Sequence, residues 1–185
     1  MNKLSVSRRA AVVRALVEGN SIRSVCRITD TAKGTVMRLL ADVGRVCAQY
    51  PREALIDLPC GEIQCDEMWA FCYAKQKNVP ADKQSEFGYG DVWIFSAIDA
   101  QSKLVPTWLV GLRDGGHAYE FMSDLAMRLA HRIQMTTDGH RMYLDAVEDA
   151  FGTGIDYAML MKLYGGAEPE GQRRYSPAEC IGMDT

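Results

Sequence analysis

Two aspartates, Asp66 and Asp138, have the sequence settings best suited to chemistry. Asp66 lies in residues 61–71, where apolar side chains alternate with mostly polar ones, and it falls on the polar side of this strand-like pattern. Asp138 follows a second strand-like run, residues 133–137, and precedes a glycine at a turn. Because Mg²⁺ prefers carboxylate oxygens and keeps several waters, two such acids on neighbouring strands can hold it between them. The pattern therefore indicates a divalent-cation site built on Asp66 and Asp138.

Each aspartate also has a simpler interpretation when it is taken alone. Asp66 could be a solvent-exposed carboxylate on a strand, and Asp138 could cap the helix that follows it. Glu67 points to the opposite side of the strand from Asp66 and is expected to be structural. A carboxylate buried there needs a partner, such as Lys103 or Arg113.

Composition and charge separate the chain into a basic front and an acidic body. The 185 residues suffice for one good core and a small extra module. Residues 1–58 carry 10 Lys and Arg against 5 Asp and Glu, whereas residues 59–185 carry 11 against 19. The basic front is expected to meet a polyanion and the acidic body to hold cations.

The six cysteines and the hydropathy pattern bear on the location of the protein. The cysteines show no C-x-x-C spacing, which favours reduced, buried thiols over zinc ligands or disulfides. No apolar run has the length of a membrane span, and the N-terminus lacks the apolar core of a signal peptide. We expect a cytoplasmic, nucleoid-associated protein without a membrane partner.

The first 48 residues are predicted to form a helix-turn-helix domain. Helical periodicity marks residues 8–18, 22–28 and 32–43, separated by short turns, and arginine and lysine are in excess. In this motif the start of the last helix enters the major groove of duplex DNA. The residues expected to face DNA are Thr31, Lys33, Thr35 and Arg38. The alternative is a small helical bundle whose cations are merely solvated.

The remainder is predicted to be a linker, residues 49–60, and an α/β domain, residues 61–185. Strand patterns cover residues 61–71, 91–98, 104–112, 133–137 and 155–164, and helical patterns cover residues 116–132 and 140–151. A polar loop, residues 73–90, carries Lys75 and Lys77, which either contact DNA phosphates or are solvated. The order of elements is that of a ribonuclease H-like core, a mixed sheet with helices, in which the crossover helix lays residues 133–137 beside the first strand.

Several short stretches, in this order and spacing, resemble bacterial insertion-sequence transposases of the IS-one type. They are residues 64–71, 91–93 with Asp99, 111–114, 137–140 and 175–177. The resemblance implies a DDE transposase, which binds the terminal inverted repeats of an insertion element and uses Mg²⁺ (or Mn²⁺) to cleave and join double-stranded DNA at transposon ends and target. It assigns the first two acids to Asp66 and Asp138. Members of the family work as multimers, so a homodimer or larger assembly is expected.

The third acid of that family has no counterpart in this sequence. It lies on a helix beyond the Tyr-Ser-Pro stretch, and the sequence ends at Thr185 before such a segment. Glu168, Glu170 and Glu179 lack a helical setting, and Glu148 belongs to a solvated acidic face. We therefore expect a truncated transposase that lacks the final helices of its core, with impaired catalysis. The alternative function is a non-catalytic DNA-binding regulator or inhibitor of transposition.

Overall fold

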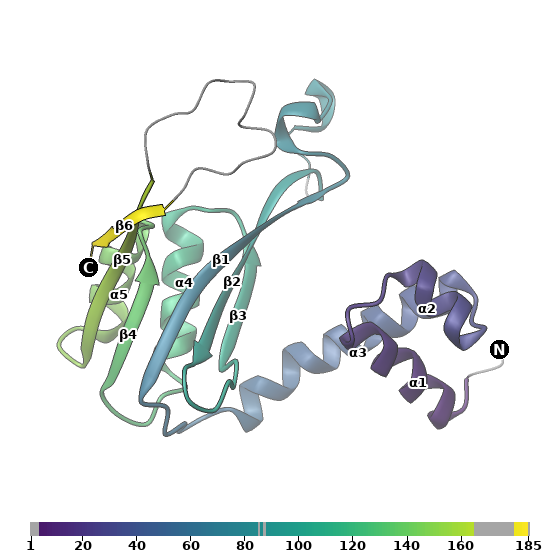
Figure 1. Ribbon diagram of the computed structural model, residues 1–185, viewed down its shortest axis with the longest axis horizontal. Coiled ribbons are helices and arrows are strands. Elements are labelled where there is room, and N and C mark those ends of the chain that lie inside the picture. The colour runs from purple at the N-terminus through teal and green to yellow at the C-terminus, as the bar shows by residue number, and fades with distance from the viewer. Residues whose placement is uncertain (1–3, 85, 87, 165–179, 185) are drawn as a thin grey trace. The chain divides into compact units, whose positions relative to one another are not determined.

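The computed structural model describes residues 4–84, 86, 88–164 and 180–184, which fall into two compact units (Figure 1). The first unit comprises residues 1–54 and the second residues 55–185. Within the described part of the chain, none of the helices combines the length and hydrophobicity that a bilayer crossing requires.

The first unit is a bundle of three helices held by a small valine core. The helices are α1 (Val6–Val17), α2 (Ile22–Thr29) and α3 (Lys33–Ala54). Each helix contributes one fully buried valine, and these are Val12, Val25 and Val36. The three helices predicted from periodicity are therefore present, with their apolar positions turned to one another.

Side chains define where these helices begin and how they are connected. The hydroxyls of Ser5 and Ser21 accept hydrogen bonds from backbone N–H groups in the first turns of α1 and α2. Ser5 and Ser21 are thus the residues that cap α1 and α2. The Arg8 guanidinium donates to the carbonyls of Thr29 and Asp30, at 3.1 and 2.7 Å, and so ties α1 to the turn between α2 and α3.

Helix α3 is longer than its sequence pattern indicated. It continues through Pro51 to Ala54, so residues 49–54 are helical where a linker was predicted. Proline normally marks a helix end because it lacks an N–H and crowds the preceding turn. Here α3 nevertheless continues for three residues beyond Pro51, from Arg52 to Ala54.

The second unit is a mixed sheet with strand order β3-β2-β1-β4-β5-β6 (Figure 1). The pairs β1–β2, β2–β3 and β5–β6 are antiparallel, whereas β1–β4 and β4–β5 are parallel. This confirms the predicted fold class, an N-terminal helical unit followed by a mixed α/β sheet compatible with a ribonuclease H-like core, and the placement of β4 beside β1. The strands are β1 (Glu62–Cys72), β2 (Gly90–Asp99), β3 (Thr107–Gly111), β4 (Ile133–Asp138), β5 (Ile155–Tyr164) and β6 (Cys180–Asp184).

Two helices, α4 (Gly115–Ala126) and α5 (Met142–Phe151), supply the helical side of the core. Phe121 on α4 and Tyr143 on α5 pack against Phe95 of β2, with ring centroids 5.7 to 6.5 Å apart. Alternate residues of the central strands, such as Ile63 and Met135, complete this core. The opposite face of the sheet carries the residues in between, including Asp66.

Three segments differ from the sequence-based expectation. Helix α4 ends at Ala126 and not at Arg132, and residues 73–90 contain two short 3₁₀ helices, Gln76–Asn78 and Ala81–Lys83. Strand β6 had no predicted counterpart, because Cys180–Asp184 carries little alternation. Its pairing with β5 is the kind of long-range contact that local pattern does not encode.

The N-terminus of α4 provides a test of this fold. The Asp114 carboxylate accepts hydrogen bonds from the backbone N–H of His117, at 2.9 Å, and from its ring, which lowers the pKa of Asp114. Asp114→Ala is expected to lower the free energy of unfolding by about 1 kcal/mol. The loss should be full above pH ~4 and should disappear as the pH falls through the folded-state pKa, because protonation removes the same contribution in the wild type. Urea unfolding at neutral and acidic pH measures this, and Asp114→Asn, which still caps, should lose much less stability.

Candidate functional site

The pairing of β1 with β4 places Asp66 and Asp138 at the same level of the sheet. The parallel register aligns Gln64 with Thr136 and Cys65 with Thr137. Asp66 and Asp138 each lie one residue beyond the last of these pairs, and thus at the same level of the sheet. Neighbouring strands lie roughly 4.8 Å apart, so the two carboxylates leave the backbone side by side. Cys65 and Thr137, which directly precede the two aspartates, are buried on the face that α4 and α5 cover. Because side chains alternate along a strand, Asp66 and Asp138 lie on the opposite face.

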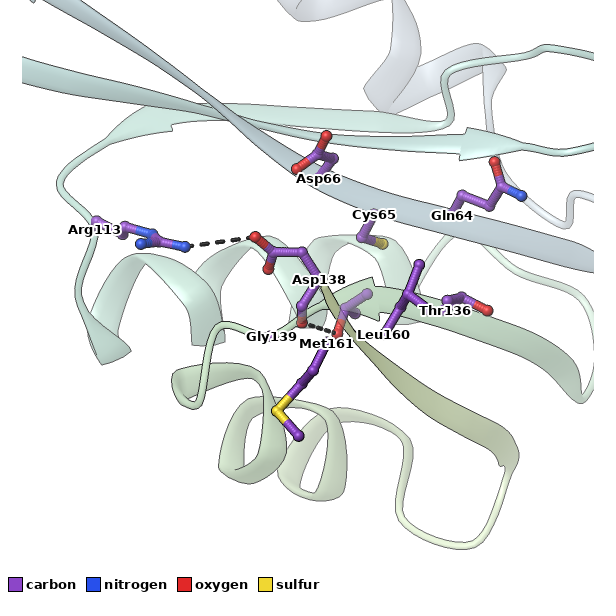
Figure 2. Close-up of a pocket in the computed structure, with 10 residues that line it drawn as sticks. Gln64, Cys65, Asp66, Arg113, Thr136, Asp138, Gly139, Leu160 and Met161 are labelled. Carbon is purple, nitrogen blue, oxygen red and sulfur yellow. Dashed lines mark hydrogen bonds and ion pairs between the residues drawn. The ribbon is translucent and has the colours of Figure 1, made fainter. Parts of the chain in front are cut away.

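Both aspartates line one open cleft of about 660 Å³ (Figure 2). Figure 2 shows Asp66 on β1, Asp138 at the end of β4, and Arg113 reaching Asp138 from a third segment. Gln64 and Thr136, two residues before each aspartate, share its face of the sheet. The residues lining the cleft are Gln64, Cys65, Asp66, Arg113, Thr136, Thr137, Asp138, Gly139, Leu160 and Met161.

Each carboxylate is oriented by one backbone hydrogen bond. Oδ1 of Asp66 accepts from the N–H of Glu67 at 2.8 Å, and Oδ1 of Asp138 accepts from the N–H of His140 at 3.1 Å. Helix α5 begins at Met142 after Arg141, so Asp138 closes a turn and does not cap that helix. The second oxygen of each carboxylate keeps lone pairs for another ligand, which is what a hard cation needs.

Glu67 is buried and paired with Arg113, as its position on the core side of β1 led us to expect. Its side chain is 0% exposed, and its Oε2 accepts from Nε and Nη2 of Arg113 at 3.1 and 3.0 Å. The guanidinium also lies over the Trp93 ring, 4.7 Å from its centroid. Nη2 lies 3.5 Å from Oδ2 of Asp138, a contact that the sequence did not suggest. Arg113 therefore links the buried acid to the acid in the cleft.

Burial keeps two groups beside the cleft in their neutral forms. It raises the pKa of the Cys65 thiol, and the nearby Glu67 and Asp66 carboxylates raise it further. It raises the pKa of Tyr143 in the same way, again with Glu67 adding to the effect. A protonated Cys65 is a poor metal ligand, since the thiolate is the form that binds. The groups that the cleft offers to a hard cation are therefore its carboxylate oxygens.

The aspartate pair has no third metal-binding partner within the described residues. No group of three His, Cys, Asp or Glu side chains suited to a metal ion occurs there. Glu148 is exposed on α5, as expected of a solvated acid. The glutamates at 168, 170 and 179, and the segment 175–177 used in the resemblance, lie outside the described residues.

The predicted DNA contacts of the first unit are only partly on its surface. Lys33 and Arg38 are exposed in the first turns of α3, and Thr35 is half-buried with its hydroxyl 3.4 Å from Nη2 of Arg38. Thr31 is only 6% exposed and its hydroxyl donates to the carbonyl of Thr29. This corrects the prediction that Thr31 faces DNA: it closes the turn before α3.

The two lysines predicted beyond β1 are exposed. The Nζ of Lys75 lies over the Trp69 ring, 4.9 Å from its centroid, and Lys77 lies in the 3₁₀ helix that follows. The backbone N–H of Gln76 donates to Asp91 at 2.9 Å and fixes this segment against the start of β2. Both lysines are thus held near β1 and accessible, and their contact with DNA stays a prediction.

Comparison with known proteins gives only distant structural likenesses. No protein-family model matches the chain, and no curated protein matches it. Among solved structures, it is similar to the piggyBac transposase in a synaptic complex with hairpin DNA, with 12% sequence identity and a TM-score of 0.47. The match covers 92% of this chain and 44% of the transposase, so the chain spans less than half of that protein's length.

The Glu67–Arg113 pair can be tested through stability. Arg113→Met is expected to lower the free energy of unfolding by about 2 kcal/mol at neutral pH, because it leaves a buried carboxylate without its cation. Urea unfolding at neutral pH measures the loss. Arg132→Met, which breaks an exposed pair with Asp156, should lower the free energy of unfolding by much less.

Proposed function

We propose that this protein is a DNA transposase of an insertion element, or a remnant of one. The observation that carries the proposal is the matched placement of Asp66 and Asp138 on adjacent parallel strands, with both lining one cleft. Each offers an oxygen that the backbone does not engage. This donor set suits Mg²⁺ or Mn²⁺, with water and substrate oxygens completing the coordination.

The residues of the cleft would then position a phosphodiester for displacement. When bound, divalent cations activate the attacking oxygen and stabilise the leaving one. The backbone bonds from Glu67 and His140 hold Asp66 and Asp138 in place before any ligand arrives, which is the preorganisation that phosphoryl transfer requires. Arg113 restrains Asp138 from the far side of the cleft.

The helical unit would supply the affinity for terminal inverted repeats. Lys33, Thr35 and Arg38 lie at the start of α3, the position that enters the major groove in a helix-turn-helix. Lys75 and Lys77 would add phosphate contacts near β1. A dimer or larger assembly would bring two transposon ends together.

A second candidate, a non-catalytic DNA-binding regulator, is favoured by one observation. Within the described residues, no third His, Cys, Asp or Glu side chain joins the carboxylate pair to form a metal-binding group. Two carboxylates hold a cation less firmly and leave its geometry less defined than three do. A chain of this kind would bind transposon ends through α3 and occupy them without cleaving.

The metal site makes a first functional prediction. Asp66→Asn and Asp138→Asn should each weaken Mn²⁺ binding, followed by electron paramagnetic resonance, by more than about tenfold, because each removes a charged ligand. Asp145→Asn, which removes an exposed acid on α5, should bind Mn²⁺ as the wild type does.

The same variants separate the two functions in a cleavage assay. Mg²⁺-dependent nicking of a duplex carrying a transposon end, lost in both cleft variants, supports the transposase. Tight DNA binding without nicking by the wild type supports the regulator. Unchanged Mn²⁺ binding in both cleft variants would contradict the proposed site itself.

DNA binding by α3 makes a second functional prediction. Arg38→Ala should weaken binding to the transposon end and reduce the slope of log affinity against log salt by about 0.9, the value for one lost phosphate contact. Arg45→Ala is the matched control, because Arg45 lies further along α3 and is paired with Asp42. Equal effects of the two substitutions would show that the charge of the unit, and not the start of α3, governs affinity.

A further inference from the structure

We propose that Arg113 is the phosphate-binding residue of the cleft, the group that grips the DNA backbone beside Asp66 and Asp138. The inference rests on the proposed function for the identity of its ligand, a phosphodiester. It is argued from the geometry of the Arg113 guanidinium, one edge of which is held by Glu67 while the other edge faces the cleft.

The fixed edge of Arg113 is held by a buried carboxylate and a half-buried ring. Nε and Nη2 both donate to Oε2 of Glu67, whose side chain is 0% exposed, and the guanidinium plane rests on Trp93. Arginine side chains usually lose conformational freedom when they bind a ligand. Arg113 has lost it already in the folded protein, so binding would cost little further ordering.

The open edge of Arg113 faces the cleft. Nη1 has no hydrogen-bond partner within the described residues, and Nη2 has only the 3.5 Å contact with Asp138 beyond its bond to Glu67. The side chain is 36% exposed and lines the cleft with both aspartates. Nη1 and Nη2 together form the planar fork that matches two oxygens of a phosphate.

The number of donors explains why Glu67 does not satisfy this arginine. A guanidinium carries five N–H donors, and Glu67 accepts from only two of its nitrogens, Nε and Nη2. Nη2 also lies 3.5 Å from Oδ2 of Asp138. Donors on Nη1 and Nη2 therefore remain for a phosphate oxygen.

The test is carried out without metal and with both cleft aspartates replaced, so that its outcome does not depend on the proposed metal site. The full chain carrying Asp66→Asn and Asp138→Asn is titrated in EDTA with a short oligothymidylate. The readout is the ¹⁵N–¹H resonance of Arg113 Nε, identified by its absence in Arg113→Lys. We expect this resonance to shift on titration. Affinity in this background should fall about tenfold with Arg113→Met, the effect of losing a charge-assisted hydrogen bond, and by less with Arg113→Lys.

Two matched controls keep the result interpretable. Arg132→Met removes an arginine of the same unit whose Nε, Nη1 and Nη2 are all engaged by Asp156 and Thr153, and it should leave affinity unchanged. If Arg113→Met does not fold, the comparison is Glu67→Gln with Glu67→Gln/Arg113→Met, which leaves no buried charge.

An Arg113 resonance that does not shift, or equal affinities with and without Arg113, would overturn the inference. Failure of Mn²⁺ binding in the wild type would overturn the proposed metal site and leave the Arg113 result standing.

Discussion

The parallel pairing of β1 with β4 is the constraint on which the cleft depends. Its register decides that Asp66 and Asp138, which are far apart in the sequence, leave the sheet at one level and on one face. A slip of one residue would turn one of the two carboxylates into the core, because side chains alternate between faces. The buried side chains of Ile63, Cys65, Met135 and Thr137 hold the register in place. Packing of buried side chains on one face of the sheet thus fixes the relative positions of the Asp66 and Asp138 carboxylates on the other.

The same alternation gives two adjacent acids on β1 different environments. Asp66 is exposed in the cleft, whereas Glu67 points to the core side and is covered completely. A carboxylate buried without a partner would cost several kcal/mol or bind a proton. Arg113 prevents this, and because it comes from the segment before α4, the Glu67–Arg113 pair also fixes the edge of the cleft. The ion pair that compensates the buried charge of Glu67 thereby also places the Arg113 guanidinium next to Asp138.

Local pattern predicted most elements and placed Asp66 and Asp138 on strands, but it did not predict contacts between distant segments. The alternation around Ile63 and Ile133 predicted β1 and β4, and the apolar stripes of α1 to α5 predicted the helices. The end of α3 was predicted too early, because proline usually marks a helix end, whereas here the helix continues past Pro51 to Ala54. Thr31 looked like a surface residue because nothing local shows that the turn folds its hydroxyl inward. The approach of Arg113 to Asp138 depends on β3, α4 and β4 together, so no spacing in the sequence records it.

The front of the chain and the remainder differ in the sign of their net charge. The front of the chain, residues 1–58, carries an excess of cations, whereas residues 59–185 carry 11 Lys and Arg against 19 Asp and Glu. The α/β unit would therefore repel a nucleic acid unless its cleft were neutralised, and within the cleft Arg113 is a single cation shared by Glu67 and Asp138. Under the proposed function, long-range attraction to DNA would come from the basic front, and the approach of a phosphate to Asp66 and Asp138 would be accompanied by cations. On this reasoning DNA binding should survive the loss of the cleft carboxylates, whereas positioning of a phosphate in the cleft should not survive the loss of both metal and Arg113.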